Sequence, residues 1–303
     1  IAEPGRLPTS LRRALLADPD PHLLFKLFET FGPNWWMQRR AETFRLGREY
    51  DRVLPTHYVI EPASGRGRVL DGRSSPSLAE PGVGELVTLH NFAQRERRLD
   101  GVSLSLLGTP PAGQPPLRVR WLSLSEPNGA TGRVVATRRT LLDEFAAGME
   151  RFGLRDPLEG LTALLDTSVA GTRSTIHGDL NLENVLVGPG DFVWLIDFAQ
   201  TRDGHPLFDF AHLEAEIITQ VIAPQIPAAH DYLALIQGHP KAEYAHLAVL
   251  RNAVQEIAGR CLFNPSQPGE YTLALKMACL GALKFTNLDA HQKHLLYLTA
   301  AWL

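Results

Sequence analysis

The chain has 303 residues, of which 44% are hydrophobic and 21% are charged, so it is long enough for one large globular domain or two small ones. A net charge of −3 and a pI near 6.4 give it no general attraction to nucleic acid or to anionic membranes. No apolar run reaches the ~18 residues that a membrane-spanning helix needs. These values exclude a disordered chain, a strongly basic nucleic-acid binder and a helical membrane protein.

The cysteines and the first residue bear on the compartment and on the extent of the chain. Cys261 and Cys279 are the two cysteines, and they lie in sequence with helical spacing, which does not favour a disulfide framework. Free thiols are typical of a reducing compartment, and we expect a cytoplasmic protein. The first residue is Ile1 rather than Met, and no signal-peptide pattern follows it. We therefore expect a fragment or a processed form of a longer protein.

The first 56 residues have helical periodicity, and the next 83 do not. Apolar residues predict helices around 10–16, 23–31 and 39–54. Between residues 57 and 139, short alternating runs are separated by Gly and Pro turns. We predict strands near 57–61, 67–71, 85–93, 101–108, 117–124 and 132–139. Such a set favours a small antiparallel barrel or sandwich, with a five-stranded OB-like barrel as one candidate.

Helical periodicity returns near Thr140 and dominates the rest of the chain. One apolar face is predicted to run from Leu141 to Phe152, and a second helix covers residues 158–165. From Phe208 onward the pattern is almost entirely helical. The sequence therefore predicts an α+β chain. Its helical domain would comprise residues 1–56 and 140–303, and a β-rich domain would be inserted at 57–139.

Residues 176–199 hold the densest group of chemically useful side chains. Asp179 follows His177-Gly178, four residues separate it from Asn184, and Asp197 follows a second apolar run. The Gly188-Pro189-Gly190 sequence between the two runs predicts a hairpin. A single Asp before an apolar run is usually a cap or a turn, but the joint pattern is much rarer. Carboxylate and amide oxygens at the ends of strands suit a hard cation such as Mg²⁺.

This pattern resembles the H-R-D-L-x-x-x-N and D-F-G motifs of protein kinases. It is most similar to the aminoglycoside phosphotransferase branch of that fold, whose G-x-P-x-x-D-L-A stretch resembles residues 204–211. The resemblance implies a C-lobe that binds ATP and Mg²⁺ and transfers the γ-phosphoryl group to a hydroxyl acceptor. It implies the following roles: Asp179 is catalytic, Asn184 and Asp197 bind the metal, and His177 and Asp209 support the loop.

A kinase also needs an N-terminal lobe that supplies a Gly-rich loop and a strand-borne lysine. The only lysine before residue 241 is Lys26, and its surroundings predict a helix. The glycines between residues 65 and 72 are better explained by a hairpin turn. We therefore expect the N-lobe to be absent and the phosphotransferase to be inactive as this isolated chain. Trp35-Trp36 would then be either core residues or a patch that such a lobe covers.

The layout as a whole is similar to the ternary complex associated domains of bacterial multidomain signalling proteins. The features that suggest it are the segment of residues 50–55 leading into the strands and the phosphotransferase-like motif after them. This resemblance implies an alternative function, a pseudokinase-like regulatory or scaffold module whose β-rich insertion binds a protein partner. Nucleic acid is not an expected partner, because the arginines of the insertion are better explained as a solvated face. His212 and Glu216 have metal-ligand spacing but lack a third ligand.

Overall fold

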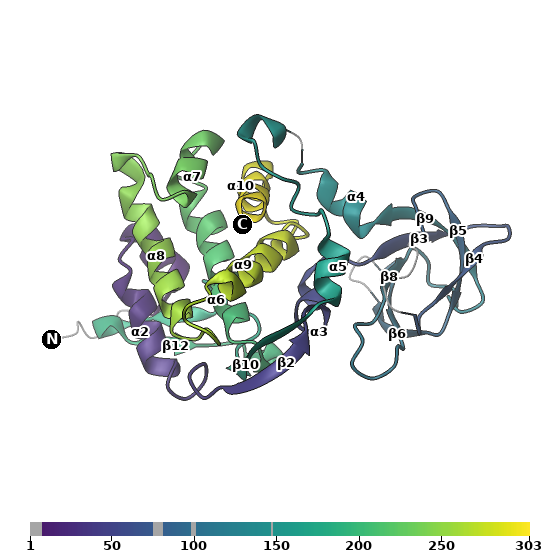
Figure 1. Ribbon diagram of the computed structural model, residues 1–303, viewed down its shortest axis with the longest axis horizontal. Coiled ribbons are helices and arrows are strands. Elements are labelled where there is room, and N and C mark those ends of the chain that lie inside the picture. Colours follow the sequence, from purple (N-terminus) through teal and green to yellow (C-terminus); the bar gives the residue numbers. More distant parts are fainter. Residues whose placement is uncertain (1–7, 75–80, 98–100, 147) are drawn as a thin grey trace. The chain divides into compact units, whose positions relative to one another are not determined.

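The computed structural model describes residues 8–74, 81–97, 101–146 and 148–303 (Figure 1). The chain divides into two compact units. Unit 1 comprises Ile1–Phe44, Gly148–Pro157 and Val169–Leu303, and unit 2 comprises Arg45–Ala147 and Leu158–Ser168. None of the described helices combines the length and the apolar character needed to cross a lipid bilayer.

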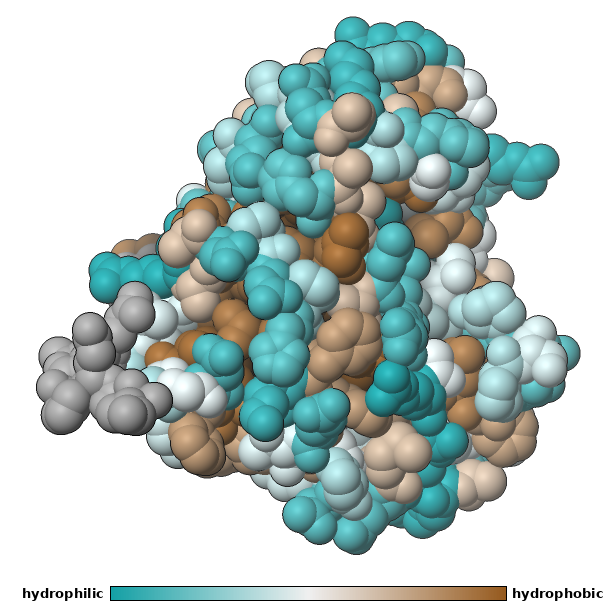
Figure 2. All heavy atoms as spheres, turned by 90° about the vertical axis from the view of Figure 1, so that its left-hand side faces the viewer, coloured by the Kyte–Doolittle hydropathy of each residue, from teal (hydrophilic) through white to brown (hydrophobic). Residues whose placement is uncertain are grey.

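Unit 1 is built mainly from helices. They are α1 (Leu11–Ala17), α2 (His22–Phe31), α6 (Leu207–Ile217), α7 (Ala229–Ile236), α8 (Ala245–Gly259), α9 (Gly269–Ala282) and α10 (Ala290–Trp302). Helix α6 packs against α8 and α9, and it continues into a π-helical turn at Ile218–Ile222 (Figure 1). Because nine of its eleven residues are buried, α6 is the central helix of this unit. On the face shown in Figure 2, the remaining apolar surface lies in separate patches between hydrophilic side chains.

Two small sheets complete unit 1. One has the order β1 (Thr9–Ser10), β11 (Val185–Val187), β12 (Val193–Leu195), and its strands are antiparallel. The other has the order β13 (Arg202–Gly204), β10 (Ser168–Ile176), β2 (Arg40–Arg45). The predicted hairpin of residues 185–195 is therefore present.

Two of the predicted helices are wrong in extent. Residues 40–45 form strand β2 rather than the start of a helix, because Arg40 pairs in bidentate fashion with Asp203 on β13 and the strand joins β10. Helix α4 (Arg138–Asp143) ends long before Phe152. The backbone is left-handed at Gly148 (φ 82°), which a continuing helix does not allow.

Unit 2 is a nearly closed, barrel-like sheet of seven strands with short helices. The helices are α3 (Leu46–Tyr50), which runs into the turn Asp51–Val53, then α4, and α5 (Leu161–Asp166). The strand order is β4 (Arg68–Asp71), β5 (Leu86–His90), β9 (Thr131–Thr137), β3 (Tyr58–Pro62), β8 (Arg118–Trp121), β7 (Leu104–Gly108), β6 (Phe92–Arg97). The pairs β3–β8 and β4–β5 are parallel, and the other pairs are antiparallel.

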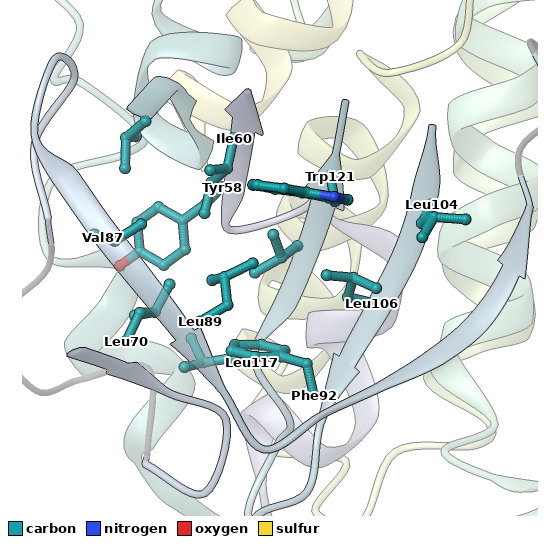
Figure 3. Close-up of a cluster of buried hydrophobic side chains, with 12 residues drawn as sticks. Tyr58, Ile60, Leu70, Val87, Leu89, Phe92, Leu104, Leu106, Leu117 and Trp121 are labelled. Atoms are coloured by element: carbon teal, nitrogen blue, oxygen red, sulfur yellow. The ribbon is translucent and has the colours of Figure 1, made fainter. Parts of the chain in front are cut away.

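Inward-pointing side chains from all seven strands fill the centre of this sheet (Figure 3). Trp121, Ile60 and Val134 are completely buried there. The α+β class and the small barrel-like β-rich block are thus confirmed. The sheet has seven strands rather than the five of an OB-like barrel, partly because the left-handed Asn91 (φ 61°) divides the predicted strand 85–93 into β5 and β6. The compact unit also reaches beyond 57–139, since α3 and α5 pack against each other.

Candidate functional site

The buried carboxylate of Asp209 holds the start of the loop that carries the sequence motif. This loop, residues 177–184, is called the motif loop. Asp209 lies in the first turn of α6 and accepts hydrogen bonds from the backbone N–H groups of His177 (2.7 Å) and Gly178 (2.8 Å). The indole Nε1 of Trp36 donates a third bond of 2.8 Å. Burial raises the pKa of the Asp209 carboxyl, and these three donors oppose the rise.

Gly178 lets the motif loop pass close to the segment that follows Asp197. Its backbone is left-handed (φ 80°), and a Cβ built on it would lie 2.3 Å from the carbonyl oxygen of Gln200. A side chain at this position would therefore face both backbone strain and a steric clash. Asp209 and Gly178 together fix where the chain leaves β10 and enters the motif loop.

Both backbone polar groups of Ile196, the residue before Asp197, are hydrogen-bonded. The N–H of Ile196 donates to the carbonyl of Asn184 (3.0 Å), and Nε2 of the buried His177 donates to the carbonyl of Ile196 (2.9 Å). Asp197 itself has a left-handed backbone, with φ 59° and ψ 68°. Such a conformation is uncommon for a residue other than glycine and is found where surrounding structure over-determines it, often at functional sites.

Asn184 lies directly beside Asp179. Its Nδ2 donates to the carbonyl of Asp179 (2.9 Å) and lies 3.4 Å from the carboxylate Oδ2 of the same residue. Its backbone N–H bonds to Asn181, which shapes the turn between them. Because the amide nitrogen faces Asp179, the amide oxygen is directed to the other side. Within the described ranges, no hydrogen bond is made to that oxygen.

The structure therefore brings four of the five predicted site residues into one hydrogen-bonded arrangement. Asp209 binds the backbone of His177, which binds the residue before Asp197, and Asn184 contacts Asp179. The fifth, Asp197, is joined to the others through backbone. Its exposed carboxylate accepts only from the N–H of Ala199, at 3.4 Å, among the residues that the structure describes.

The donor set suits Mg²⁺ better than a transition metal. The described residues contain no group of three His, Cys, Asp or Glu side chains that could hold a metal ion. Asn184 and Asp197 instead offer one amide oxygen and one carboxylate, neither occupied by a strong protein donor. Mg²⁺ is usually held by one or two such oxygens, with waters and phosphates completing its shell.

Two further titratable side chains, His212 and Glu216, interact with Asp179, although their spacing in the sequence suggested only a metal pair. Nδ1 of His212 lies 3.8 Å from Oδ1 of Asp179. Burial lowers the pKa of His212, and the charge of Asp179 opposes that shift. Burial and the charge of Asp179 also raise the pKa of Glu216 to about 7. Both residues follow Asp209 at i+3 and i+7 on α6, and that spacing could have revealed the shared face.

An exposed apolar face borders this site on β11 and β12. It consists of the half-buried Leu186 and the exposed Phe192, Trp194 and Ile196, which share one side of the hairpin because Leu186 pairs with Trp194 and the other two alternate with it. The rings of Phe192 and Trp194 stack at 6.2 Å. Leu186 lies two residues after Asn184, and Ile196 directly precedes Asp197. The face thus adjoins the predicted metal ligands.

The two residues of the Trp35-Trp36 pair have different environments. Trp36 is fully buried against Phe28 and Phe210, whereas Trp35 is half-buried and lies 6.4 Å from the ring of His177 and 5.9 Å from that of Phe198. Trp36 is therefore core, and Trp35 packs beside the motif loop.

Comparison with known protein families gives one match. A model of the family described as Ternary complex associated domain 9 matches residues 23–257. The matched range is more than half of the chain, and it contains the seven-stranded sheet, the motif loop and the residues around Asp197 and Asp209. A comparison with curated proteins gives no match. The resemblance to the ternary complex associated domains is confirmed: the chain belongs to the Ternary complex associated domain 9 family.

Proposed function

We propose that unit 1 is a phosphotransferase-derived domain that binds a magnesium nucleotide at the motif loop. The observation that carries this proposal is the clamp of Asp209 on the backbone of His177 and Gly178. Phosphoryl transfer needs little covalent help from a protein, but it needs polar groups held in fixed positions. A buried carboxylate that holds two backbone amides, and is itself held by the indole of Trp36, serves such positioning.

Asn184 and Asp197 would hold the metal in this proposal. When bound, Mg²⁺ would neutralise charge on the nucleotide phosphates. The amide of Asn184 is oriented by its bond to Asp179, so its oxygen needs no reorientation to act as a ligand. The left-handed backbone of Asp197 begins the short turn Phe198–Gln200 and sets the direction of its carboxylate. The exposed apolar face would supply a surface on which a nucleobase could stack.

Asp179 would orient or accept the proton of the attacking hydroxyl group. Two titratable groups act on Asp179: His212 lies 3.8 Å from its carboxylate, and Glu216 interacts with the charge of that carboxylate. Burial keeps His212 neutral near pH 7 because it disfavours the imidazolium form. The pair on α6 would thereby contribute to the electrostatic environment of the attacking hydroxyl group.

A second candidate function is a regulatory or scaffold module that binds a protein partner without transferring phosphate. The positions of the lysines favour this second function. Lys26 lies on α2, and the other four lysines lie on helices or in loops. In kinases, a lysine on a strand contacts the nucleotide phosphates, and none of the lysines of this chain lies on a strand. Exposed Phe192 (64%) and Phe198 (50%) are further features of a surface that a partner could cover.

Calorimetric titration with Mg-ATP tests the proposal. We expect binding by the unmodified chain, at least a tenfold loss in Asp197→Ala, and no loss in Asp18→Ala, which removes an exposed carboxylate elsewhere in unit 1. Binding that is equal in Asp197→Ala, or absent at millimolar nucleotide, would contradict it. Release of ADP that Asp179→Asn abolishes while binding persists would favour transfer over the regulatory function.

A further inference from the structure

Unit 2 contains a cavity of about 400 Å³ whose residues all belong to this unit. Its apolar wall is formed by Leu142 of α4 and by Leu158, Leu161 and Leu165 around α5. Polar side chains gather on another part of the lining. Cavities of this size with an apolar wall and a few converging polar groups are the usual form of a small-molecule site.

Around the polar part of the lining, the buried side chains carry more positive than negative charge. The buried carboxylate of Asp51 accepts from Arg118 Nε (2.9 Å) and Arg138 Nη1 (2.7 Å). Two guanidinium groups therefore share one carboxylate. His57, which lies beside them, accepts a bond on Nδ1 from the backbone N–H of Arg118 (3.0 Å) and adds no negative charge. Burial and Arg138 lower the pKa of His57 to about 4, so it also adds no positive charge near pH 7.

The surplus positive charge belongs to Arg138. The side chain of Arg118 also donates to the backbone carbonyls of Arg52, Leu54 and Pro55, and it does not line the cavity. Arg138 does line it and is only 11% exposed. A buried guanidinium that shares its carboxylate partner with a second guanidinium is only partly neutralised, and an anion beside it would complete the neutralisation.

Arg138 also retains donors for such an anion. A guanidinium has five N–H groups. Those of Arg138 donate to the Pro55 carbonyl (2.9 Å), to Asp51 (2.7 Å) and to Nδ1 of His57 (3.4 Å), which leaves two without a partner in the described chain. The other charged groups of the lining are paired: Asp166 with Arg45 (3.0 Å) and Arg139 with Asp143 (3.2 Å).

We propose that this cavity binds a small organic anion, with an apolar body against the leucine wall and a carboxylate or phosphate head group bound by Arg138. The recognition chemistry is an oxyanion accepting two charge-assisted hydrogen bonds from one guanidinium. The site is independent of the proposed nucleotide site, since it uses other residues and another unit of the chain.

Matched probes test the proposal on the full chain. Hexanoate and phenyl phosphate would be titrated, each against its neutral counterpart, hexanamide and phenol. We expect at least one anion to bind at least tenfold more tightly than its counterpart. The preferred head group then identifies the class as carboxylate or phosphate. Equal binding of the neutral probes, or no binding of either anion at millimolar concentration, would overturn the proposal.

Two variants locate the site. Arg138→Gln should abolish the preference for anions, but it also removes a partner of buried Asp51 and could unfold unit 2. Ala163→Trp avoids this difficulty, because Ala163 is an exposed residue of the lining whose enlargement fills the cavity. It should reduce anion binding at least tenfold, whereas Ala93→Trp, on an exposed position of β6, should not. Unchanged binding in Ala163→Trp, or binding lost in Asp197→Ala, would place the anion elsewhere and refute the proposal.

Discussion

Single buried carboxylates organise both units of this chain. Asp209 is completely buried and satisfies three N–H donors from two separate segments, and Asp51 is the shared acceptor of two arginines. In each case one side chain bonds residues that are far apart in sequence. Carboxylates that accept several donors are worth more than neutral acceptors, because charge-assisted bonds are about twice as strong. Removing either acceptor would leave several buried donors unsatisfied.

Glu216 leads to a prediction on pH dependence. Its pKa is raised from 4.5 to about 7 in the folded chain, so the folded state holds this proton more tightly than the unfolded state does. The resulting stabilisation is fully present below pH 4.5 and is lost as the pH rises through about 7. We expect the free energy of unfolding of Glu216→Gln, relative to the unmodified chain, to rise by about 1–3 kcal/mol across this range.

Urea unfolding of the two proteins at a series of pH values measures that difference. Glu29→Gln is a suitable control, because Glu29 is exposed on α2 and is not among the groups that shift the pKa of Glu216. A difference between Glu216→Gln and the unmodified chain that does not vary with pH would show that Glu216 titrates normally.

At the scale of elements, a close contact between two glycines brings the outer strand β4 against β7. A Cβ on Gly108, at the end of β7, would lie 2.4 Å from the carbonyl oxygen of Gly72, which follows β4. A Cβ on Gly72 would in turn lie 2.9 Å from Cα of Gly108. The nearly closed form of the sheet thus depends on the absence of side chains at both positions.

Gly108→Ala should therefore destabilise unit 2. Because the atoms that it meets belong to the backbone, they cannot move aside cheaply, and we expect a loss of about 1–3 kcal/mol. Hydrogen exchange should show faster exchange of the amides of β4 and β7. Gly82→Ala is the matched control, since its new methyl group would meet only the flexible end of Glu85 at 3.4 Å. Equal stability of the two variants would refute the proposed role of the glycine contact.

At the scale of the whole molecule, the chain has two separate cores. One is enclosed by the seven-stranded sheet of unit 2, and the other lies around helix α6 of unit 1. Unit 2 is discontinuous in sequence, because Gly148–Pro157 belongs to unit 1. Each unit therefore has a hydrophobic interior of its own, which is the usual mark of separate domains.

A core substitution tests how far the two interiors behave separately. Leu89→Ala removes a completely buried side chain from unit 2 and should cost about 2–5 kcal/mol. We expect hydrogen exchange to accelerate in strands β3, β5 and β9 and to stay unchanged in α6 and α9. Acceleration of the same size in both units would mean that they unfold as one cooperative body.

Elements with strong local signals were predictable from the sequence. The hairpin of β11 and β12 follows from two apolar runs around Gly188-Pro189-Gly190, and the alternating pattern of residues 57–139 indicates the barrel-like sheet. The close placement of His177, Asp179 and Asn184 also follows from their short separation in sequence. Period and spacing act within a few residues, and so they are readable without tertiary contacts.

Other features depend on partners that are distant in sequence, and only the tertiary structure decided them. Residues 40–45 have helical periodicity but form β2, because Asp203 and β10 provide a better alternative. His212 meets Asp179 only because Asp209 anchors α6 to the motif loop. Arg138 faces a cavity with surplus charge because Arg118 and Asp51 converge on it from other elements. Local propensity is weak compared with such contacts, and it does not encode which distant segments meet.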